Sequence, residues 1–383
     1  MNKKDANNII LAKSAGFCFG VDRAVGLVNE AIEKLNSHEK DNNLNSENTK
    51  DEKNRNSVCT FGEIIHNRIV CEMFEKRGVR VVGSIDEIRQ NDKVILRSHG
   101  VTKDVIEELK KRKIRYIDGT CPFVSKIHNI VKQKQFVIII GDKDHEEVKG
   151  IISNCDFEYK IIKNISEAIE FVKNINNKNI KFKKSVDNLD FICYNKQDLL
   201  FSVVFQSTYN TKSAEEITKL FKDKLGDKVV IYDTICPATE IRQTEAAEIA
   251  RKVDTMFVIG DSLSSNTNKL YEICKLYCND TYRIDNASSE VLKKNKIKNT
   301  IGVTAGASTP NEIVWEVLSM LENIDNNIDV ETGENFEKLL EESLAENPRK
   351  VRAGMSVKGK VEFVNNIEAK CSFIDNFTAL TGV

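Results

Sequence analysis

The sequence predicts an α/β protein of three pseudo-symmetric units, each a small, mainly parallel sheet flanked by helices, arranged as a trefoil around a common centre. Two observations predict this fold. Short apolar strand segments alternate with helical patterns, which is typical of parallel sheets with crossover helices. The same order of segments also occurs three times, over about residues 9–117, 118–232 and 233–322.

One cysteine begins each unit. Cys18, Cys121 and Cys236 each lie where an apolar strand gives way to an amphipathic helix. Pro122 and Pro237 directly follow their cysteines, at a position where proline favours a helix start. We therefore expect the three thiols at helix N-termini, and threefold packing would bring them to one point.

The helices and strands next to the cysteines follow the same scheme. The helix after Cys18 has an apolar face made of Val21, Val25, Val28, Ile32 and Leu35. The helix after Cys236 has a face made of Ile241, Ala246, Ile249 and Ala250. Each unit's last strand leads by a helix to the strand before the next cysteine. We expect the strand at Ile9–Leu11 to complete the third sheet and close the ring.

Polar residues follow the strands at matching positions. The first strand of each unit ends in Gly62, Gly141 or Gly260, and a polar residue comes four positions later: His66, His145 and Ser264. The last strand of each unit ends in a second set: His99, Ser207 or Thr208, and Ser308. Equivalent positions converge around a common axis, so we expect these residues to ring a zone beside the thiols.

Three converging thiolates could hold zinc, an iron–sulfur cluster or nothing. Structural zinc sites use four ligands, usually from paired knuckles, although catalytic zinc does use three. Lone cysteines on three separate units suit a larger body better. A 4Fe-4S cluster with three cysteine ligands leaves one iron with an open coordination position, and helix N-termini would stabilise its negative charge.

The polar ring favours an anionic substrate. Its members are compact donors that suit a phosphate or diphosphate, together with backbone N–H groups of the glycine turns. They are His66, His99, Ser207, Thr208, Ser264, Ser265, Asn266 and Ser308. No Lys or Arg occupies the equivalent repeat positions. Only His145 is followed by two carboxylates, Glu146 and Glu147, and a buried carboxyl group is a plausible proton donor.

Composition bounds the remaining possibilities. The net charge of −1 gives no global attraction for nucleic acid or an anionic membrane, and no segment is apolar enough to span a bilayer. Ten cysteines without regular spacing indicate reduced thiols. We expect a cytoplasmic protein in which the other seven cysteines are small buried hydrophobic residues. Polar stretches at about 36–57 and 175–198 are predicted to be surface insertions.

The C-terminal part differs from the repeats. Residues 323–350 form an acidic linker, and 351–383 are expected to form two or three strands. This tail resembles the opening of an OB-fold RNA-binding domain of the ribosomal-protein S-one type. A complete barrel needs five strands, so we expect an incomplete OB-fold-like tail.

The repeat positions also carry the motifs of a known family. AGFCFGVDRAV, GEIIHNRIV, LRSHGV, DGTCPFVSKIH, GDKDHEEVKG, DTICPATEIRQ, GDSLSSNTNKL and GVTAGASTP occur in order. Together they resemble the LytB/IspH family of 4-hydroxy-3-methylbut-2-enyl diphosphate reductases, over about residues 9–321. The resemblance implies a 4Fe-4S cluster on Cys18, Cys121 and Cys236.

The same resemblance implies roles for the polar residues. Glu147, in an H-x-E motif after His145, would relay protons. His66, His99, His145, Ser264, Ser265, Asn266 and Ser308 would line a diphosphate pocket. The family has Thr directly after Gln in the second unit, where this chain has Ser207 and then Thr208. Which of the two hydroxyls orients the substrate hydroxyl stays open.

The reaction implied is the reductive dehydroxylation of (E)-4-hydroxy-3-methylbut-2-enyl diphosphate to isopentenyl and dimethylallyl diphosphate. This is the last step of the methylerythritol phosphate isoprenoid pathway, with ferredoxin or flavodoxin as electron donor. One alternative is a non-enzymatic iron–sulfur sensor with an RNA-binding tail, which the mildly basic tail does not favour. Another is a zinc hydrolase of phosphoesters with Glu147 as base.

Overall fold

The computed structural model describes residues 8–42, 57–176, 183–184, 200–294, 300–325, 360–364, 368–373 and 377–382. The chain divides into two compact parts, Met1–Leu318 and Ser319–Val383, and each is described by itself. Most of the two predicted insertions and the predicted linker lie outside the described residues. The first stretch predicted as an insertion begins inside a helix, which continues to Asn42.

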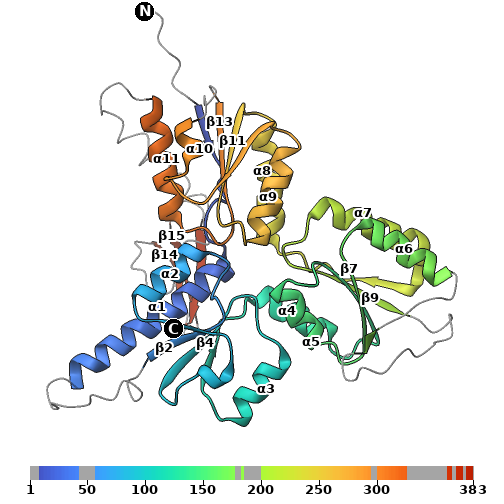
Figure 1. The fold of residues 1–383 in the computed structure, drawn as a ribbon, viewed down its shortest axis with the longest axis horizontal. Helices are drawn as coiled ribbons and strands as arrows, with labels where there is room; N and C mark the ends of the chain where they lie inside the picture. Colours follow the sequence, from blue (N-terminus) through green and yellow to red (C-terminus); the bar gives the residue numbers. More distant parts are fainter. Residues whose placement is uncertain are drawn as a thin grey trace, which may run out of the picture. The chain divides into compact units, whose positions relative to one another are not determined.

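The larger part contains three separate sheets with their helices, which form three lobes around a common centre (Figure 1). The first unit has the strand order β3-β2-β4-β5. Its strands are β2 (Ser57–Phe61), β3 (Arg80–Val82), β4 (Asp92–Leu96) and β5 (Tyr116–Asp118). Its helices are α1 (Phe19–Asn42), α2 (Arg68–Lys76), η2 (Ile85–Glu87) and α3 (Lys103–Lys111).

The second unit has the strand order β10-β9-β6-β7-β8. Its strands are β6 (Phe136–Ile140), β7 (Glu158–Ile162), β8 (Lys183–Lys184), β9 (Phe201–Phe205) and β10 (Val229–Ile231). Its helices are α4 (Pro122–Val131), α5 (Glu146–Ser153), α6 (Ile165–Asn176), α7 (Thr211–Leu225) and η3 (Gly226–Lys228). All its strand pairs are parallel except β7 with β8.

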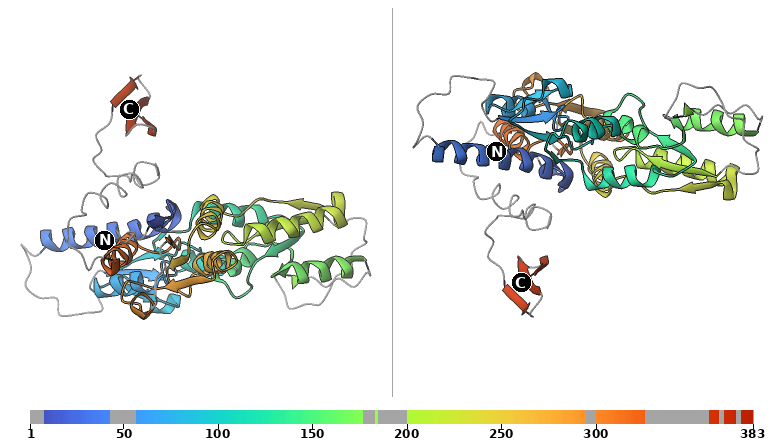
Figure 2. Two further views of the ribbon diagram at one scale, coloured as in Figure 1. Left: turned by 90° about the horizontal axis from the view of Figure 1, so that it is seen from above. Right: turned by 90° about the horizontal axis from the view of Figure 1, so that it is seen from below.

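The third unit has the strand order β1-β13-β11-β12, with all pairs parallel. Its strands are β1 (Asn8–Leu11), β11 (Thr255–Ile259), β12 (Asp280–Ile284) and β13 (Thr300–Ala305). Its helices are α8 (Pro237–Ala250), α9 (Ser265–Lys275), α10 (Glu290–Lys294) and α11 (Asn311–Asp325). In Figure 2 the second unit lies at one end of the larger part, and the first and third lie together at the other.

The sheets confirm both the threefold pattern and the closure of the ring. In each unit the strand that precedes the next cysteine adds to the edge of the sheet beside the last strand: β5 on β4, β10 on β9 and β1 on β13. The N-terminal strand therefore belongs to the third unit, as expected. The chain begins and ends this part in the same sheet.

The predicted apolar face is buried in α1, the helix after Cys18, but only partly buried in α8, the helix after Cys236. Val21, Val25, Val28 and Ile32 on α1 are buried in the core of the first unit, as predicted. On α8, however, Ile241 is 49% exposed, so its placement on a buried face was wrong. Arg242 and Gln243 are buried instead, because α8 contacts backbone carbonyls. Arg242 donates to Gly16 O, and Gln243 donates to the carbonyl of Tyr209.

The cysteines outside the centre agree with their predicted structural role where they are described. Cys59, Cys71, Cys155, Cys274 and Cys278 are all buried. Burial raises the pKa of Cys59, Cys155 and Cys274 to about 12. These thiols therefore stay protonated and pack as hydrophobic groups. The side chains of Cys193 and Cys371 lie outside the described residues.

The smaller part contains one antiparallel sheet, of order β14-β15-β16. The strands are β14 (Lys360–Val364), β15 (Glu368–Phe373) and β16 (Phe377–Gly382). The pairing of β14 with β15 has a register shift between Val361 and Phe363. The number of strands agrees with the expectation, and the OB-fold assignment stays a prediction.

Candidate active site

A cavity lies where the three units meet, and it contains every residue that the sequence singled out. The space between the lining atoms, part of it open to solvent, is about 680 Å³. The cavity is lined by Cys18, His66, His99, Cys121, His145, Glu147, Ser207, Thr208, Cys236, Ser264, Ser265, Asn266 and Ser308, together with Gly20, Val21, Ser98, Phe123, Val124, Ala238, Thr239 and Ala307.

The three cysteines are held in equivalent ways. The N–H of Cys18 donates to Ala307 O, that of Cys121 to Ser98 O, and that of Cys236 to Ser207 O, at 3.1, 2.9 and 3.0 Å. Each bond links the start of a cysteine helix to the loop after the last strand of the preceding unit. The thiols converge because the backbone N–H of each cysteine is bound to a loop of the neighbouring unit. The repeat predicted this convergence correctly.

The helix N-termini point at the sulfur atoms. Cys121 and Cys236 are the N-cap residues of α4 and α8, each with proline next. Burial raises the pKa of both thiols, to about 11 for Cys121, while N–H groups of the first helical turn oppose this shift. Gly20 leaves room for Cys121, since a Cβ atom at Gly20 would lie 2.5 Å from the Cys121 sulfur.

This donor set fits a multinuclear iron–sulfur cluster better than a single ion. Among the described residues, no group of three or more His, Cys, Asp or Glu side chains could hold one metal ion. A cubane cluster is larger than one ion, so the absence of a site for a single ion does not bear on it. Three thiols at helix N-termini are suitable ligands for an anionic cluster.

Glu147 is buried beside the second unit's last strand. Its side chain is enclosed at 1% exposure. The N–H of Ser207 donates to Oε1 at 2.6 Å, and the Ser207 hydroxyl donates to Oε2 at 2.7 Å. Burial raises the pKa of Glu147, and the two bonds from Ser207 oppose that rise. The carboxyl group therefore lies in the cavity with both oxygens oriented.

Ser207 and Thr208 have different positions in the repeat. Phe205 aligns with Ile140 in the sheet, as Leu96 aligns with Phe61 and Ala305 with Ile259. Counting from these pairs, Ser207 is equivalent to Ser98 and Ala307, and Thr208 is equivalent to His99 and Ser308. Ser207 binds Glu147, whereas Thr208 contacts the Ser265 hydroxyl at 3.1 Å and accepts from Gln206 Nε2 at 3.1 Å.

Three histidines form a cluster at one side of the cavity, two from the first unit and one from the second. The ring centroids of His66 and His99 are 4.0 Å apart, those of His66 and His145 are 5.2 Å apart, and those of His99 and His145 are 5.8 Å apart. Burial lowers the pKa of each ring, to about 4 for His145 and well below the usual value for His99. All three rings are therefore neutral near pH 7.

Several buried polar atoms of the cavity have no hydrogen-bond partner within the described part of the chain. They are Nε2 of His66, Nε2 of His145 and both amide atoms of Asn266. Nδ1 of His145 accepts from the N–H of Glu147, so its proton is on Nε2. Buried polar groups are normally paired. These atoms therefore indicate a polar ligand.

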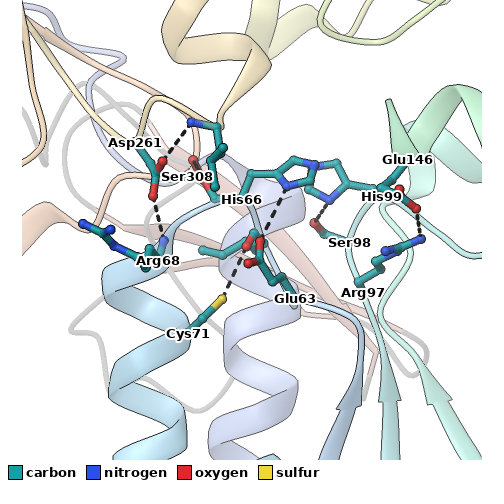
Figure 3. A network of polar contacts seen from close by, with 12 residues as sticks. Glu63, His66, Arg68, Cys71, Arg97, Ser98, His99, Glu146, Asp261 and Ser308 are labelled. Carbon is teal, nitrogen blue, oxygen red and sulfur yellow. Dashed lines mark hydrogen bonds and ion pairs between the residues drawn. The ribbon is translucent and has the colours of Figure 1, made fainter. Parts of the chain in front are cut away.

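Ser308 holds the third unit against the first, and the other serines complete the polar lining. Ser264 is the N-cap of α9 and accepts from the N–H of Thr267. The Ser308 hydroxyl donates to His66 O at 2.9 Å, and Asn67 donates to Ser308 O at 2.8 Å. Asp261, in the third unit, accepts from the N–H of Arg68 at the start of α2 (Figure 3).

The sequence did not predict three residues around the cavity. Arg97 pairs with Glu146 across the first two units at 2.5 Å, Gln206 bonds to Thr208, and Glu63 lies beside His66 at 3.9 Å. Figure 3 shows Arg97 and Glu63 around the rings of His66 and His99. Arg97 aligns in the repeat with Gln206 and Gly306, so threefold similarity gave no signal for it.

The fold and cavity define a class: a trefoil of three α/β units with one inward cysteine from each and a neutral, donor-rich pocket beside them. The LytB protein family model matches residues 9–322. The chain belongs to this family.

Curated relatives carry one name. A 4-hydroxy-3-methylbut-2-enyl diphosphate reductase from Thermoanaerobacter sp. is 36% identical over 319 residues, 82% of this chain and 96% of that protein. One from Clostridioides difficile is 37% identical over 324 residues, 83% of this chain and 100% of that protein. One from Clostridium acetobutylicum is 34% identical over 369 residues and 94% of this chain, which spans 50% of that protein.

Two solved structures share the fold. One is (E)-4-hydroxy-3-methyl-but-2-enyl diphosphate reductase, described as the terminal enzyme of the non-mevalonate pathway. It has a TM-score of 0.53 at 30% identity, covering 83% of this chain and 99% of that chain. The other is the E-1-hydroxy-2-methyl-but-2-enyl-4-diphosphate reductase from Plasmodium falciparum, with a TM-score of 0.65 at 25% identity, covering 88% of this chain and 98% of that chain.

Proposed function

We propose that this chain is an iron–sulfur reductase that converts (E)-4-hydroxy-3-methylbut-2-enyl diphosphate to isopentenyl and dimethylallyl diphosphate. The observation that carries the proposal is one cavity shared by three thiols, a buried carboxyl group bound to Ser207, and polar atoms that indicate a ligand. Family membership and the names of the relatives support the same reaction.

Cys18, Cys121 and Cys236 would hold the cluster, with no cysteine for the fourth iron. None of the other cysteines described structurally lines the cavity. When bound, a 4Fe-4S cluster would supply the two electrons of the reduction and Lewis acidity at its open iron. The first-turn N–H groups at Cys121 and Cys236 stabilise negative charge on the sulfur atoms.

The diphosphate would be bound by neutral donors. Nε2–H of His145, Asn266 and the hydroxyls of Ser264 and Ser265 line the space beside the histidine cluster, and Ser308 lines it while its hydroxyl donates to His66 O. His145 and Ser264 are also the N-caps of α5 and α9, whose N-termini favour an anion. No Lys or Arg is among the cavity-lining residues that the structure describes.

Glu147 would donate protons to the substrate. Burial raises its pKa, which keeps more of the carboxyl group in the acidic form near neutral pH. We assign orientation of the substrate hydroxyl to Ser207, since its hydroxyl lies 2.7 Å from Glu147 while Thr208 is bound to Gln206 and Ser265. Proton delivery at either end of the allylic unit gives the two products.

The supply of electrons requires a partner, and we propose ferredoxin or flavodoxin in that role. None of the helices in the described ranges combines the length and the apolar character needed to span a bilayer. The cytoplasmic location and the low weight given to RNA binding by the tail stay predictions.

Anaerobic reconstitution with iron and sulfide, followed by an assay on the allylic diphosphate with reduced viologen, tests the proposal. We expect absorption near 400 nm, equal iron and sulfide, and both products. Glu147→Gln should keep the absorption and abolish turnover, whereas Glu146→Gln, in which the partner of Arg97 and Lys149 is changed, should keep kcat. A colourless, zinc-loaded protein would contradict the proposal, and so would turnover by Glu147→Gln.

A further inference from the structure

The proposed reaction needs a supply of protons to a buried site. Replacing a hydroxyl group by hydrogen, with loss of water, consumes two electrons and two protons. Glu147 is 1% exposed and is bound on both oxygens by Ser207. Its carboxyl group must therefore be reprotonated through other groups that reach solvent.

His66 lies between the cavity and the protein surface. Its Nε2 is buried and has no protein partner in the described ranges. Its Nδ1 is 3.9 Å from Oε2 of Glu63, whose side chain is 46% exposed. Figure 3 shows the Glu63 carboxylate on the side of the His66 ring away from His99. The two nitrogens of one ring thus face an accessible acid and the cavity interior.

The other two cavity histidines lack this arrangement. Nδ1 of His145 accepts the N–H of Glu147, so that nitrogen is occupied by a backbone group that does not exchange its proton in turnover. Nδ1 of His99 is 3.2 Å from the Ser98 hydroxyl, and Ser98 is buried. Among the described residues, the His66 ring has a carboxylate 3.9 Å from a ring nitrogen, whereas Asp142 and Glu146 act on His145 only by raising its pKa.

We propose that Glu63 and His66 form the proton inlet of the cavity. This inference rests on the proposed function. A small rotation of Glu63 brings its protonated carboxyl group to Nδ1 of His66, which takes the proton. Nε2–H of the ring then releases a proton to the bound anion or water beside Glu147, and Glu63 recovers a proton from solvent. The ring is left with its proton on Nδ1, and its reorientation returns an N–H group to the cavity before the next proton passes. No electrons move in this step. Glu63 touches no substrate and acts through His66.

The surrounding charges suit repeated proton exchange. Burial raises the pKa of Glu63, with Asp261 of the third unit and Glu75 of α2 acting in the same direction and Arg97, which follows β4, opposing them. Burial and Arg97 lower the pKa of His66, while Glu146 of α5 and Asp261 raise it. The pKa of the donor is raised and that of the acceptor is lowered, a pair of shifts in the directions that favour transfer both ways.

Glu63→Gln tests the inlet, because Gln keeps the size and polarity of the side chain beside His66 but has no acidic proton to give. We expect kcat to fall by about 10-fold or more, below the 10²–10⁴-fold effect of direct general acid catalysis, with KM for the diphosphate unchanged. The solvent deuterium isotope effect on kcat should increase. A small acid such as imidazolium should restore turnover of the variant and leave the wild type unaffected.

Two variants separate proton supply from other roles. Glu72→Gln changes an exposed carboxylate of α2 that pairs with Arg68, and should leave kcat unchanged. Glu63→Ala should behave like Glu63→Gln. If Gln restores the activity that Ala loses, Glu63 only orients His66, and the inlet is wrong.

The wild type in the same assay separates this inference from the proposed function. Without wild-type turnover, the proposed function fails and the inlet with it. Wild-type turnover together with an unchanged kcat and isotope effect in Glu63→Gln overturns the inlet alone. A raised KM at constant kcat also overturns it, because that result assigns Glu63 to substrate binding.

Discussion

Ser207 and Thr208 are neighbours in the chain but contact different partners. The Ser207 hydroxyl bonds to Glu147, and the Thr208 hydroxyl bonds to Gln206 and Ser265. The two residues occupy different positions in the threefold repeat. Ser207 orients the carboxyl group of Glu147, and Thr208 links the second unit to the third. Substitution of each residue should therefore have different kinetic effects.

We expect Ser207→Ala to lower kcat by about 100-fold, the low end of the range for general acid catalysis, and Thr208→Ala to change mainly KM. Removing the hydroxyl takes away a bond that lowers the pKa of Glu147. The pKa of Glu147 rises further, so the alkaline fall of kcat should move to higher pH. Steady-state kinetics across pH measures both effects. The opposite order of the two kcat losses would assign the orienting role to Thr208.

The repeat predicted some site residues and could not predict others. Cysteines and strand-end polar residues occupy equivalent positions in the three units. Each position was therefore supported by its two counterparts in the other units. Glu63 and Arg97 have no such support, because their roles arise where one unit contacts the cavity or its neighbour. Arg97 corresponds in register to Gln206 and Gly306. A contact between units leaves no trace in a pattern within one unit.

At the scale of elements, the start of α1 is shaped by a neighbouring helix. Gly20 lies in the first turn of α1, against the sulfur of Cys121 at the start of α4. A side chain at Gly20 would occupy the place of that sulfur. The close approach of two helix N-termini therefore depends on glycine here, whereas a Cβ at Gly26 of the same helix meets nothing within 4 Å.

The pair Gly20→Ala and Gly26→Ala tests this dependence. Gly20→Ala should lower iron and sulfide content after reconstitution, because the Cys121 sulfur is displaced. Its far-ultraviolet circular dichroism should match the wild type. Gly26→Ala should keep the full iron content and stabilise α1 by up to about 1 kcal/mol through helix propensity. Equal iron content in the two variants would show that Cys121 adapts to the added methyl group.

Element prediction from sequence was strongest for strands and weakest for helix faces. Every strand segment singled out near a cysteine or glycine position is a strand, and β6, β9 and β11 are buried along their whole length, as continuous apolar runs inside parallel sheets are. The face of α8 was wrong at Ile241, since the helix turns Arg242 and Gln243 toward carbonyls of other segments. Helix orientation follows such polar contacts, and hydrophobicity alone does not show them.

Across the whole trefoil, residues that follow the last strand of each unit bridge it to the next unit with different chemistry. An ion pair, Arg97 with Glu146, joins the first and second units. A hydroxyl pair, Thr208 with Ser265, joins the second and third. The Ser308 hydroxyl bonds to the backbone of His66 and joins the third and first. Of these three bridges, the charged one is at the interface that forms the histidine cluster.

Removing this charged bridge should affect both stability and binding. The Arg97 and Glu146 side chains are 17% and 32% exposed, and Arg97 also donates to Gly100 O next to His99. We expect Arg97→Met to lower the free energy of unfolding by about 1 kcal/mol and to raise KM for the diphosphate, because His145 would no longer be held against His66 and His99.

Lys103→Met is the matched control, since Lys103 pairs with Asp156 between the same units at 46% and 36% exposure. That change should cost about 0.5 kcal/mol or less and leave KM unchanged. Denaturant titration and steady-state kinetics measure both quantities, and equal KM values in the two variants would show that the bridge does not order the histidine cluster.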